Sequence, residues 1–574
     1  MTVPPEVEVG FGRTLVSLAT AKWEGDIRRY NRVLGCVPHT AHPSMKTLLI
    51  GLDAATWRRI DPLLEQGDLP AIADLIDSGV RGTLTSTMPP MTPLAWTSIS
   101  TGANPGKHGV FDFLEQNQRT YELSPFDFAR TERPALWDLL NGAGVGVGVV
   151  NYPAVDTGTE ADPFFVSGIP AEIGDEIATA EVRSVLREFD YRVHPRTDPG
   201  RDPDGYFDEV VSITESQRDV VLALYERYEP DVLWPVFMGI DWIQHYLWNE
   251  TVRGEDAVDE FYRFIDGIVG QLVGAIGDDW TVVVLSDHGA REIDGAIHTN
   301  TLVEEWGYLG RTEESRSVAE RIRTGALGWA HSLGARLPRG VKRVIKERLS
   351  EDALHEARKA VGASQLHLAV DIDWRRTEAF AFGYMGRLFV HDESRYPDGV
   401  VSEAEYDELV TELMTRLEGL EHPESGVSLV ERAVPATEVY DGPYTAQGPD
   451  VLFVPTDWRY MVYGNFGENW ITEPRGRVAD HDSEGIVVVD GPMSGTGTVD
   501  MHVTDIAPTL LYLHDVALLD DMDGNVQMKA LADSLTASRD PRTVEHTPEF
   551  TPVDRRGTDV DNDLTQRLDD LGYL

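Results

Sequence analysis

The chain has 574 residues, of which 41% are hydrophobic and 26% charged, a mixture that excludes a disordered protein and suffices for one large α/β domain or several smaller ones. Its 97 acidic and 50 basic side chains give a formal net charge of −47, which argues against nucleic acid as a partner because phosphate backbones are bound by basic surfaces. With only seven lysines, the composition is typical of proteins from a salt-saturated cytoplasm, where screening removes most self-repulsion.

Cysteine usage and the apolar runs indicate where the protein works. The single cysteine, Cys36, excludes an intramolecular disulfide framework and cysteine-rich zinc modules. No apolar run approaches the roughly 18 residues of a membrane helix, so no transmembrane segment is expected. The first 21 residues place Glu6 and Glu8 ahead of an apolar patch that contains Arg13, which is the wrong order for a signal peptide. We therefore expect a cytoplasmic protein.

A weakly patterned N-terminal extension (1–44) precedes a region, from residue 46 to about 309, in which short apolar runs alternate with amphipathic stretches. This alternation predicts an α/β fold with helices flanking a mostly parallel central sheet. The clearest strands are expected at 47–52, 145–150, 232–239, 281–285 and 485–489. Four of them adjoin polar residues of metal-binding type. Open α/β sheets bind ligands beyond the carboxyl ends of their strands, so this placement is a functional signal.

Residues 311–349 reverse the charge of the chain, with ten Arg or Lys against four Glu. Their apolar spacing suits amphipathic helices broken near Pro338. We expect a basic helical insertion at about 311–372 within a main domain spanning 45–535, followed by a polar tail (536–574) with a short C-terminal helix. The insertion either packs on the acidic body of its own chain or of a second copy in a homo-oligomer, or it draws an anionic substrate or lipid surface toward the protein.

Asp53 and Thr92 each allow two interpretations. Asp53 ends this strand, and its carboxylate is suited either to bind a cation or to cap the following helix. Thr92 stands before Pro93 and an apolar helical run. It is suited either to cap that helix, with proline at the first helical position, or to aim its hydroxyl at an anion.

Three further motifs carry acidic and histidine side chains. Asp241 and His245 follow the third strand, and on a helix their i, i+4 spacing places both on one face, within reach of one metal. Asp287 and His288 follow the fourth strand, and His481 lies in a loop before the last one. Each motif is common by chance. Their conjunction at the strand ends of one sheet predicts a metal site.

Together these motifs resemble the alkaline-phosphatase superfamily and, within it, a haloarchaeal-like member of the type I phosphodiesterase/nucleotide pyrophosphatase family. The resemblance extends roughly from Lys46 to Gly524 and implies an alkaline-phosphatase-like fold. It rests on Gly-Leu-Asp53, Thr92-Pro…Thr101-Gly102…Pro105-x-x-His108-Gly109, Asp241-x-x-x-His245, Ser-Asp287-His288-Gly, His481 with Glu484-Gly485, Asp505-Ile-Ala-Pro-Thr-Leu-Leu and the ending Leu571-Gly572-Tyr573-Leu574.

The resemblance implies two divalent metal ions, usually Zn²⁺ with Mn²⁺ as the alternative, and a nucleophilic threonine. Its ligand sets are Asp241, His245 and His481 for one ion, and Asp53, Asp287, His288 and the hydroxyl of Thr92 for the other. The family register, counted back from Thr101-Gly102, selects Thr92 rather than Thr97 or Ser98 as the nucleophile. These roles suit hydrolysis of a phosphodiester, a phosphomonoester or a nucleotide pyrophosphate through a phospho-threonine intermediate, because two ions can stabilise both the attacking and the leaving oxygen.

The sequence departs from the family pattern just after His108-Gly109. Animal-type members carry an asparagine there that helps to hold the phosphoryl group, whereas this chain has Val-Phe-Asp112. Lys107 is the candidate substrate-binding residue in its place, and a solvated loop lysine is the alternative. His298 is expected to make a structural hydrogen bond.

Three other functions share some of these sequence features. A sulfatase needs a C-x-P-x-R motif, but the segment that begins at Cys36 lacks the arginine, so we reject this function. A phosphoglycerate-mutase-like phosphotransferase would also use two metal ions, but it conventionally has serine as the nucleophile and manganese as the metal. A non-catalytic phosphate-ester-binding protein is disfavoured because no expected ligand is missing. The partner expected is a small phosphate ester, whose leaving group stays open.

Overall fold

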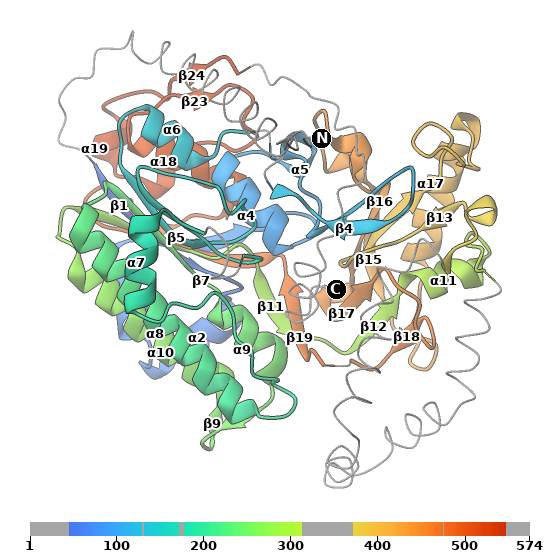
Figure 1. Cartoon of the computed structure of the whole chain (residues 1–574), viewed down its shortest axis with the longest axis horizontal. Coiled ribbons are helices and arrows are strands. Elements are labelled where there is room, and N and C mark those ends of the chain that lie inside the picture. The colour runs from blue at the N-terminus through green and yellow to red at the C-terminus, as the bar shows by residue number, and fades with distance from the viewer. Residues whose placement is uncertain are drawn as a thin grey trace, which may run out of the picture.

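The computed structural model describes residues 45–128, 131, 133–171, 177–312, 371–474 and 476–546 (Figure 1). The expected N-terminal extension over 1–44, nearly all of the expected insertion at about 311–372 and the C-terminal helix expected in the 536–574 tail lie outside these residues. The extension, the insertion and the terminal helix therefore remain predictions.

The described part of the chain is built around a nine-stranded sheet with the order β21-β2-β20-β10-β1-β7-β5-β6, in which β22 also pairs with β2. Its strands are β1 (Lys46–Leu52), β2 (Val80–Thr85), β5 (Val147–Tyr152), β6 (Pro163–Ser167), β7 (Val232–Phe237), β10 (Trp280–Leu285), β20 (Glu484–Asp490), β21 (Gly497–Thr498) and β22 (Met501–His502). β1 pairs in parallel with β10 and β7, and β5 pairs in parallel with β7 and β6. Only β20 runs antiparallel to its neighbours in this sheet. The predicted α/β fold with a mostly parallel sheet is confirmed.

All five expected strands are present, and helices cover both faces of the sheet that they form. Leu48, Leu49 and Ile50 of β1 are fully buried, as the continuous apolar runs of parallel sheets require. The helices that pack together on one face are α2 (Trp57–Gln66), α3 (Pro70–Ser78), α7 (Ala180–Glu188), α8 (Pro203–Tyr228), α9 (Gly239–Leu247) and α10 (Ala257–Ala275). Those on the other face are α4 (Thr92–Thr101), α6 (Leu136–Gly142) and α18 (Ile506–Leu513). Figure 1 shows the sheet between the two groups.

A smaller part of the molecule lies to the right in Figure 1 and has its own apolar core. It contains an antiparallel sheet with the order β13-β14-β16-β15 and a three-stranded sheet with the order β17-β12-β18. Its elements are α11 (Thr299–Trp306), α17 (Glu403–Glu418), β12 (Gly295–His298), β13 (Ala379–Phe380), β14 (Arg387–Val390), β15 (Val430–Pro435), β16 (Val451–Pro455), β17 (Tyr460–Tyr463) and β18 (Ile471–Thr472). The antiparallel pair β11 (Gly289–Glu292) and β19 (Ala479–Asp482) joins this part to the main sheet.

The remaining described elements are short. They are β3 (Leu114–Gln116), β4 (Leu123–Pro125), β8 (Thr251–Val252), β9 (Glu255–Asp256), β23 (Leu518–Leu519), β24 (Thr543–Val544), α5 (Pro105–His108) and α19 (Asp533–Thr536). Because β24 pairs with β23, the tail expected from residue 536 onward keeps contact with the body as far as Val544. Among the described residues, no helix is both long and apolar enough to cross a membrane.

The two ends of the segment assigned to the basic insertion lie side by side. The backbone N–H of Thr312 donates to the carbonyl of Asp371 over 2.9 Å, and Arg311 forms an antiparallel bridge with Ile372. The chain thus leaves and re-enters the smaller part at one place, as an inserted segment must.

Candidate metal centre

The ends of three neighbouring parallel strands bring the acidic and histidine side chains of the site together. Asp53 follows the last residue of β1, and Asp287 and His288 follow β10. Asp241 and His245 lie on α9, which begins two residues after β7. Since β10, β1 and β7 are adjacent and parallel, their carboxyl ends meet at one edge of the sheet.

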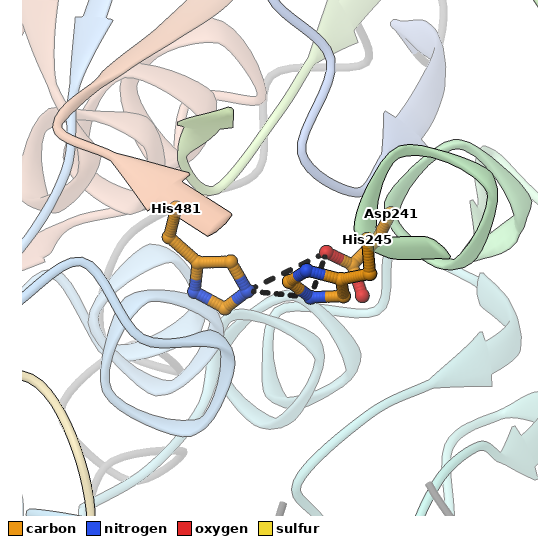
Figure 2. A group of neighbouring side chains, drawn as sticks. All are labelled: Asp241, His245 and His481. Carbon is orange, nitrogen blue, oxygen red and sulfur yellow. Dashed lines mark hydrogen bonds and ion pairs between the residues drawn. The ribbon is translucent and has the colours of Figure 1, made fainter. Parts of the chain in front are cut away.

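Asp241, His245 and His481 form the first cluster (Figure 2). Nε2 of His245 lies 2.9 Å from Oδ1 of Asp241, one helical turn away, and 3.2 Å from Nε2 of His481. Nε2 of His481 lies 3.4 Å from the same carboxylate oxygen. We expected His481 in a loop; it lies in β19 instead, because residues 479–482 pair with β11.

Backbone carbonyls orient both imidazoles of the first cluster. Nδ1 of His245 lies 2.9 Å from the carbonyl oxygen of Ala479, and Nδ1 of His481 lies 2.9 Å from that of Pro90. A neutral imidazole that donates from Nδ1 has a lone pair on Nε2. The two Nε2 lone pairs therefore face each other and the carboxylate of Asp241, an arrangement that a cation between them would stabilise.

Asp53, Asp287 and His288 form the second cluster, and Thr92 lies beside it. Nε2 of His288 lies 3.2 Å from Oδ2 of Asp287, 3.8 Å from Oδ1 of Asp53 and 3.3 Å from Oγ1 of Thr92. Asp53 does not cap the following helix, since the N-cap of α2 is Thr56. Its interpretation as a cap is therefore wrong.

The two clusters are adjacent, because the imidazole rings of His288 and His481 stack with their centroids 3.7 Å apart. Each ring belongs to a different cluster. The site is thus one continuous group of six buried acidic and imidazole side chains with Thr92 at its edge.

Burial and mutual repulsion perturb the titration of these side chains. Burial, together with the Asp287 and Asp241 carboxylates, raises the pKa of Asp53 well above its usual range. Burial likewise raises the pKa of Asp287 to about 8. Burial alone would also raise the pKa of Asp241, but the imidazoles of His245 and His481 lower it. Asp53 and Asp287 thus lack sufficient compensating positive charge among the protein's own groups, whereas Asp241 has it from the two imidazoles.

The side chains of the two clusters fit divalent metal ions. Oδ1 of Asp53, both oxygens of Asp241 and Oδ2 of Asp287 are buried without a hydrogen-bond donor among the described residues. Buried carboxylate oxygens are costly unless they are paired or coordinate a metal. Imidazole nitrogen and carboxylate oxygen are ligands that suit Zn²⁺, and carboxylate oxygen also suits Mn²⁺.

Thr92 is the first residue of α4, and the N-cap of this helix is Met91. The interpretation of Thr92 as the cap is therefore wrong. Its fully buried hydroxyl instead faces His288. The two neighbouring hydroxyl groups point elsewhere. Thr97 donates to the carbonyl of Pro93 over 2.7 Å, and Ser98 lies 3.1 Å from Nε2 of His108.

The structure does not bring Lys107 to either cluster. Its Nζ donates to Oδ1 of Asp523 over 2.5 Å and to the carbonyl of Asp521 over 3.0 Å. His298 makes the expected structural contacts, with Oδ1 of Asn465 at 2.6 Å and Oγ1 of Thr472 at 3.1 Å.

Two interactions could not be found from the sequence. Asp112 is buried and forms an ion pair with the buried Arg387. The N–H of Phe113 donates to its other oxygen over 2.6 Å. The second interaction is a 2.8 Å hydrogen bond from Nε1 of Trp96 to Oδ2 of Asp53. Neither partner is signalled by a local pattern, because 275 residues separate Asp112 from Arg387 and 43 separate Asp53 from Trp96.

The described part of the chain has an alkaline-phosphatase-like fold, with the two clusters at its strand ends. The sequence model of the type I phosphodiesterase/nucleotide pyrophosphatase family matches residues 47–484, and the chain belongs to this family. The resemblance deduced from the motifs is thereby confirmed. Membership indicates phosphoester hydrolysis of the phosphodiesterase or pyrophosphatase type in a metal-dependent family.

One solved structure shows the same architecture at low sequence identity. Phosphonoacetate hydrolase from Sinorhizobium meliloti 1021, in complex with phosphonoacetate, aligns with a TM-score of 0.52 and 14% identity over 83% of this chain and 96% of that one. Human ectonucleotide pyrophosphatase/phosphodiesterase 5 aligns with a TM-score of 0.47 and 12% identity over 85% of this chain and 100% of that one. No curated protein matches the sequence.

Proposed function

We propose that the protein is a two-metal phosphohydrolase that cleaves phosphodiester bonds through a phospho-threonine intermediate on Thr92, with phosphomonoesters and nucleotide pyrophosphates as alternative substrates. The observation that carries the proposal is the position of the Thr92 hydroxyl. It lies at the N-terminus of α4 and 3.3 Å from Nε2 of His288, beside two adjacent clusters of metal-binding type.

In this proposal each cluster holds one divalent ion, with Zn²⁺ favoured over Mn²⁺. Asp241, His245 and His481 would hold one ion, and Asp53, Asp287, His288 and Thr92 the other. When bound, the two ions would lower the pKa of the threonine hydroxyl and neutralise the oxygens of the transferred phosphoryl group. Their charge also offsets the repulsion that such an acidic protein exerts on an anionic substrate.

The chain itself supplies the nucleophile and its position. Oγ1 of Thr92 gives up its proton to solvent and forms a bond to phosphorus while the bond from phosphorus to the leaving oxygen breaks, and the leaving oxygen takes up a proton from solvent. Water then cleaves the bond between phosphorus and Oγ1, which releases the phosphate product and restores the hydroxyl. The N-terminus of α4 favours the negative charge of the phosphoryl group throughout.

We further propose that the enzyme works in a salt-rich cytoplasm. The excess of 47 negative charges supports this setting, because screening at high ionic strength weakens repulsion both within the chain and toward an anionic substrate.

A substrate panel tests the proposed activity. Bis-p-nitrophenyl phosphate, p-nitrophenyl phosphate and a nucleoside-monophosphate ester are each incubated with the enzyme at high salt, with added Zn²⁺ or Mn²⁺ and after metal removal. We expect metal-dependent release of p-nitrophenol from the diester, and no release by Thr92→Ala. A protein that binds these esters without turning any of them over would be a binding protein, and the proposal would be wrong.

A further inference from the structure

Asp480 precedes His481 in β19 and is 2% exposed. Its Oδ1 lies 3.9 Å from Nε2 of His481 and 3.9 Å from Nδ1 of His245. We infer that Asp480 is a fourth residue of the first cluster and adds a second carboxylate to the ion bound there. The inference rests on the proposed two-metal function.

Asp480 is not needed to hold either imidazole in place. Nδ1 of His245 and Nδ1 of His481 already have backbone carbonyl acceptors, each at 2.9 Å. The nitrogen of His481 nearest to Asp480 is Nε2, which also faces Asp241 and His245. The Asp480 carboxylate thus lies 3.9 Å from one atom that points toward the centre of the cluster, Nε2 of His481, whereas the His245 atom at the same distance is Nδ1, which faces the carbonyl of Ala479.

The second observation is an unmet acceptor. Oδ2 of Asp480 is buried and has no hydrogen-bond donor among the described residues. Within the described part of the chain, Oδ1 forms one hydrogen-bonded ion pair, a long one of 3.5 Å with Nη1 of the buried Arg477. A buried carboxylate oxygen is costly unless it is hydrogen-bonded or coordinates a cation. Arg477 compensates the charge at Oδ1, and a cation in the adjacent first cluster would supply the partner that Oδ2 lacks.

A second carboxylate would change the metal preference of the first cluster. Without Asp480 the cluster offers one carboxylate and two imidazoles. With Asp480 it would offer two carboxylates and two imidazoles. Carboxylate oxygens suit Mn²⁺, whereas imidazole suits Zn²⁺. Asp480 is therefore inferred to raise affinity for both ions and to raise it more for Mn²⁺.

Asp480→Asn and Asp482→Asn form a matched pair for the test. Asp482 lies two residues along the same strand, is also buried and also contacts an arginine, with Nε of Arg58 at 3.0 Å. Its oxygens bond to Arg58 and to the backbone N–H of Glu484 rather than lying near an imidazole of the cluster. Metal-free full-length protein is titrated with Zn²⁺ and separately with Mn²⁺ at high salt, and calorimetry gives the number of ions and their affinities.

We expect Asp480→Asn to bind one of the two ions about 10- to 100-fold more weakly than the wild type, with the larger loss for Mn²⁺, and Asp482→Asn to retain both affinities. A metal-free melting temperature equal to that of the wild type shows that the loss is not unfolding. Should asparagine prevent folding, Asp480→Ser is used in its place with the same expectations.

The inference would be overturned if Asp480→Asn bound both metals with wild-type affinity. It would also be overturned if Asp480→Asn lost the same affinity for Zn²⁺ as for Mn²⁺ and Asp482→Asn showed the same loss. His481→Ala separates this failure from a failure of the proposed function. If His481→Ala loses an ion while Asp480→Asn does not, only the role of Asp480 is wrong. If the wild type binds neither metal, the two-metal function is wrong as well.

Discussion

The indole N–H of Trp96 donates a 2.8 Å hydrogen bond to Oδ2 of Asp53, which leaves Oδ1 of the same carboxylate to face His288. Trp96 lies on α4, the helix that begins with Thr92, and is fully buried. One bond therefore ties the helix of the proposed nucleophile to a carboxylate of the second cluster.

Removing this hydrogen bond should weaken metal binding by the second cluster. Trp96→Phe keeps an aromatic ring but loses the donor, so Asp53 is no longer held in one orientation. We expect an approximately 10- to 100-fold loss of affinity for one ion, as for other partners of metal ligands, measured by calorimetric titration with Zn²⁺. Trp137→Phe is the control, because Trp137 is also buried but packs against Tyr152 and Phe165. A similar loss in both variants would assign the effect to packing.

The number of bound ions tests the division into two clusters. His481→Ala removes one of three side chains from the first cluster and none from the second, so bound metal should fall from about two equivalents toward one. Metal analysis after exhaustive dialysis gives the number. His298→Ala, whose imidazole contacts Asn465 and Thr472 instead, should retain both equivalents. Two equivalents in His481→Ala would contradict the assignment.

The buried ion pair between Asp112 and Arg387 should stabilise the junction of the two parts of the molecule. Arg387→Met leaves the Asp112 carboxylate buried without its counter-charge, which should lower the free energy of unfolding by about 3–5 kcal/mol. In Asp112→Asn/Arg387→Met the uncompensated charge is gone, so the double variant should be more stable than the sum of the two single changes allows. Strictly additive losses in denaturant unfolding would show that the pair does not interact.

His108 should make stability depend on pH. Burial, with a smaller effect of Arg133, lowers the pKa of His108 to about 3. Its Nδ1 accepts the backbone N–H of Val110 over 3.1 Å, so protonation at this nitrogen would break a buried contact. Between about pH 3 and the ordinary histidine pKa near 6.5, the unfolded chain binds the proton and the folded chain does not. The stability from His108 is therefore present above pH 6.5 and falls as the pH drops toward 3.

The comparison with His108→Gln isolates this contribution from those of the many carboxylates. The free-energy gap between wild type and variant, measured by denaturant unfolding at constant high salt, should narrow as the pH is lowered from 6.5. If this difference in the free energy of unfolding stayed constant across the window, the pKa of His108 would not be lowered in the folded protein.

The sequence predicted the sheet and the members of both clusters more completely than their surroundings. Strand ends are readable because apolar runs stop at polar residues, and the i, i+4 spacing of Asp241 and His245 places both on one face of α9. The position of His481 in a strand was missed, because β19 is short and depends on its pairing with β11. The donor from Trp96 to Asp53 depends on packing that no local pattern records.

The central claim is that Thr92 carries the phosphoryl group during turnover. Wild-type enzyme is mixed with excess bis-p-nitrophenyl phosphate at high salt and quenched in acid within one turnover, and its peptides are mapped by mass spectrometry. We expect the mass of one phosphate ester on Thr92 in the wild type and no such ester in Thr92→Ala. Thr97→Ala is the control and should keep the ester, because the Thr97 hydroxyl that it lacks donates within its own helix to the carbonyl of Pro93. An ester on another residue, or full turnover by Thr92→Ala, would contradict the account.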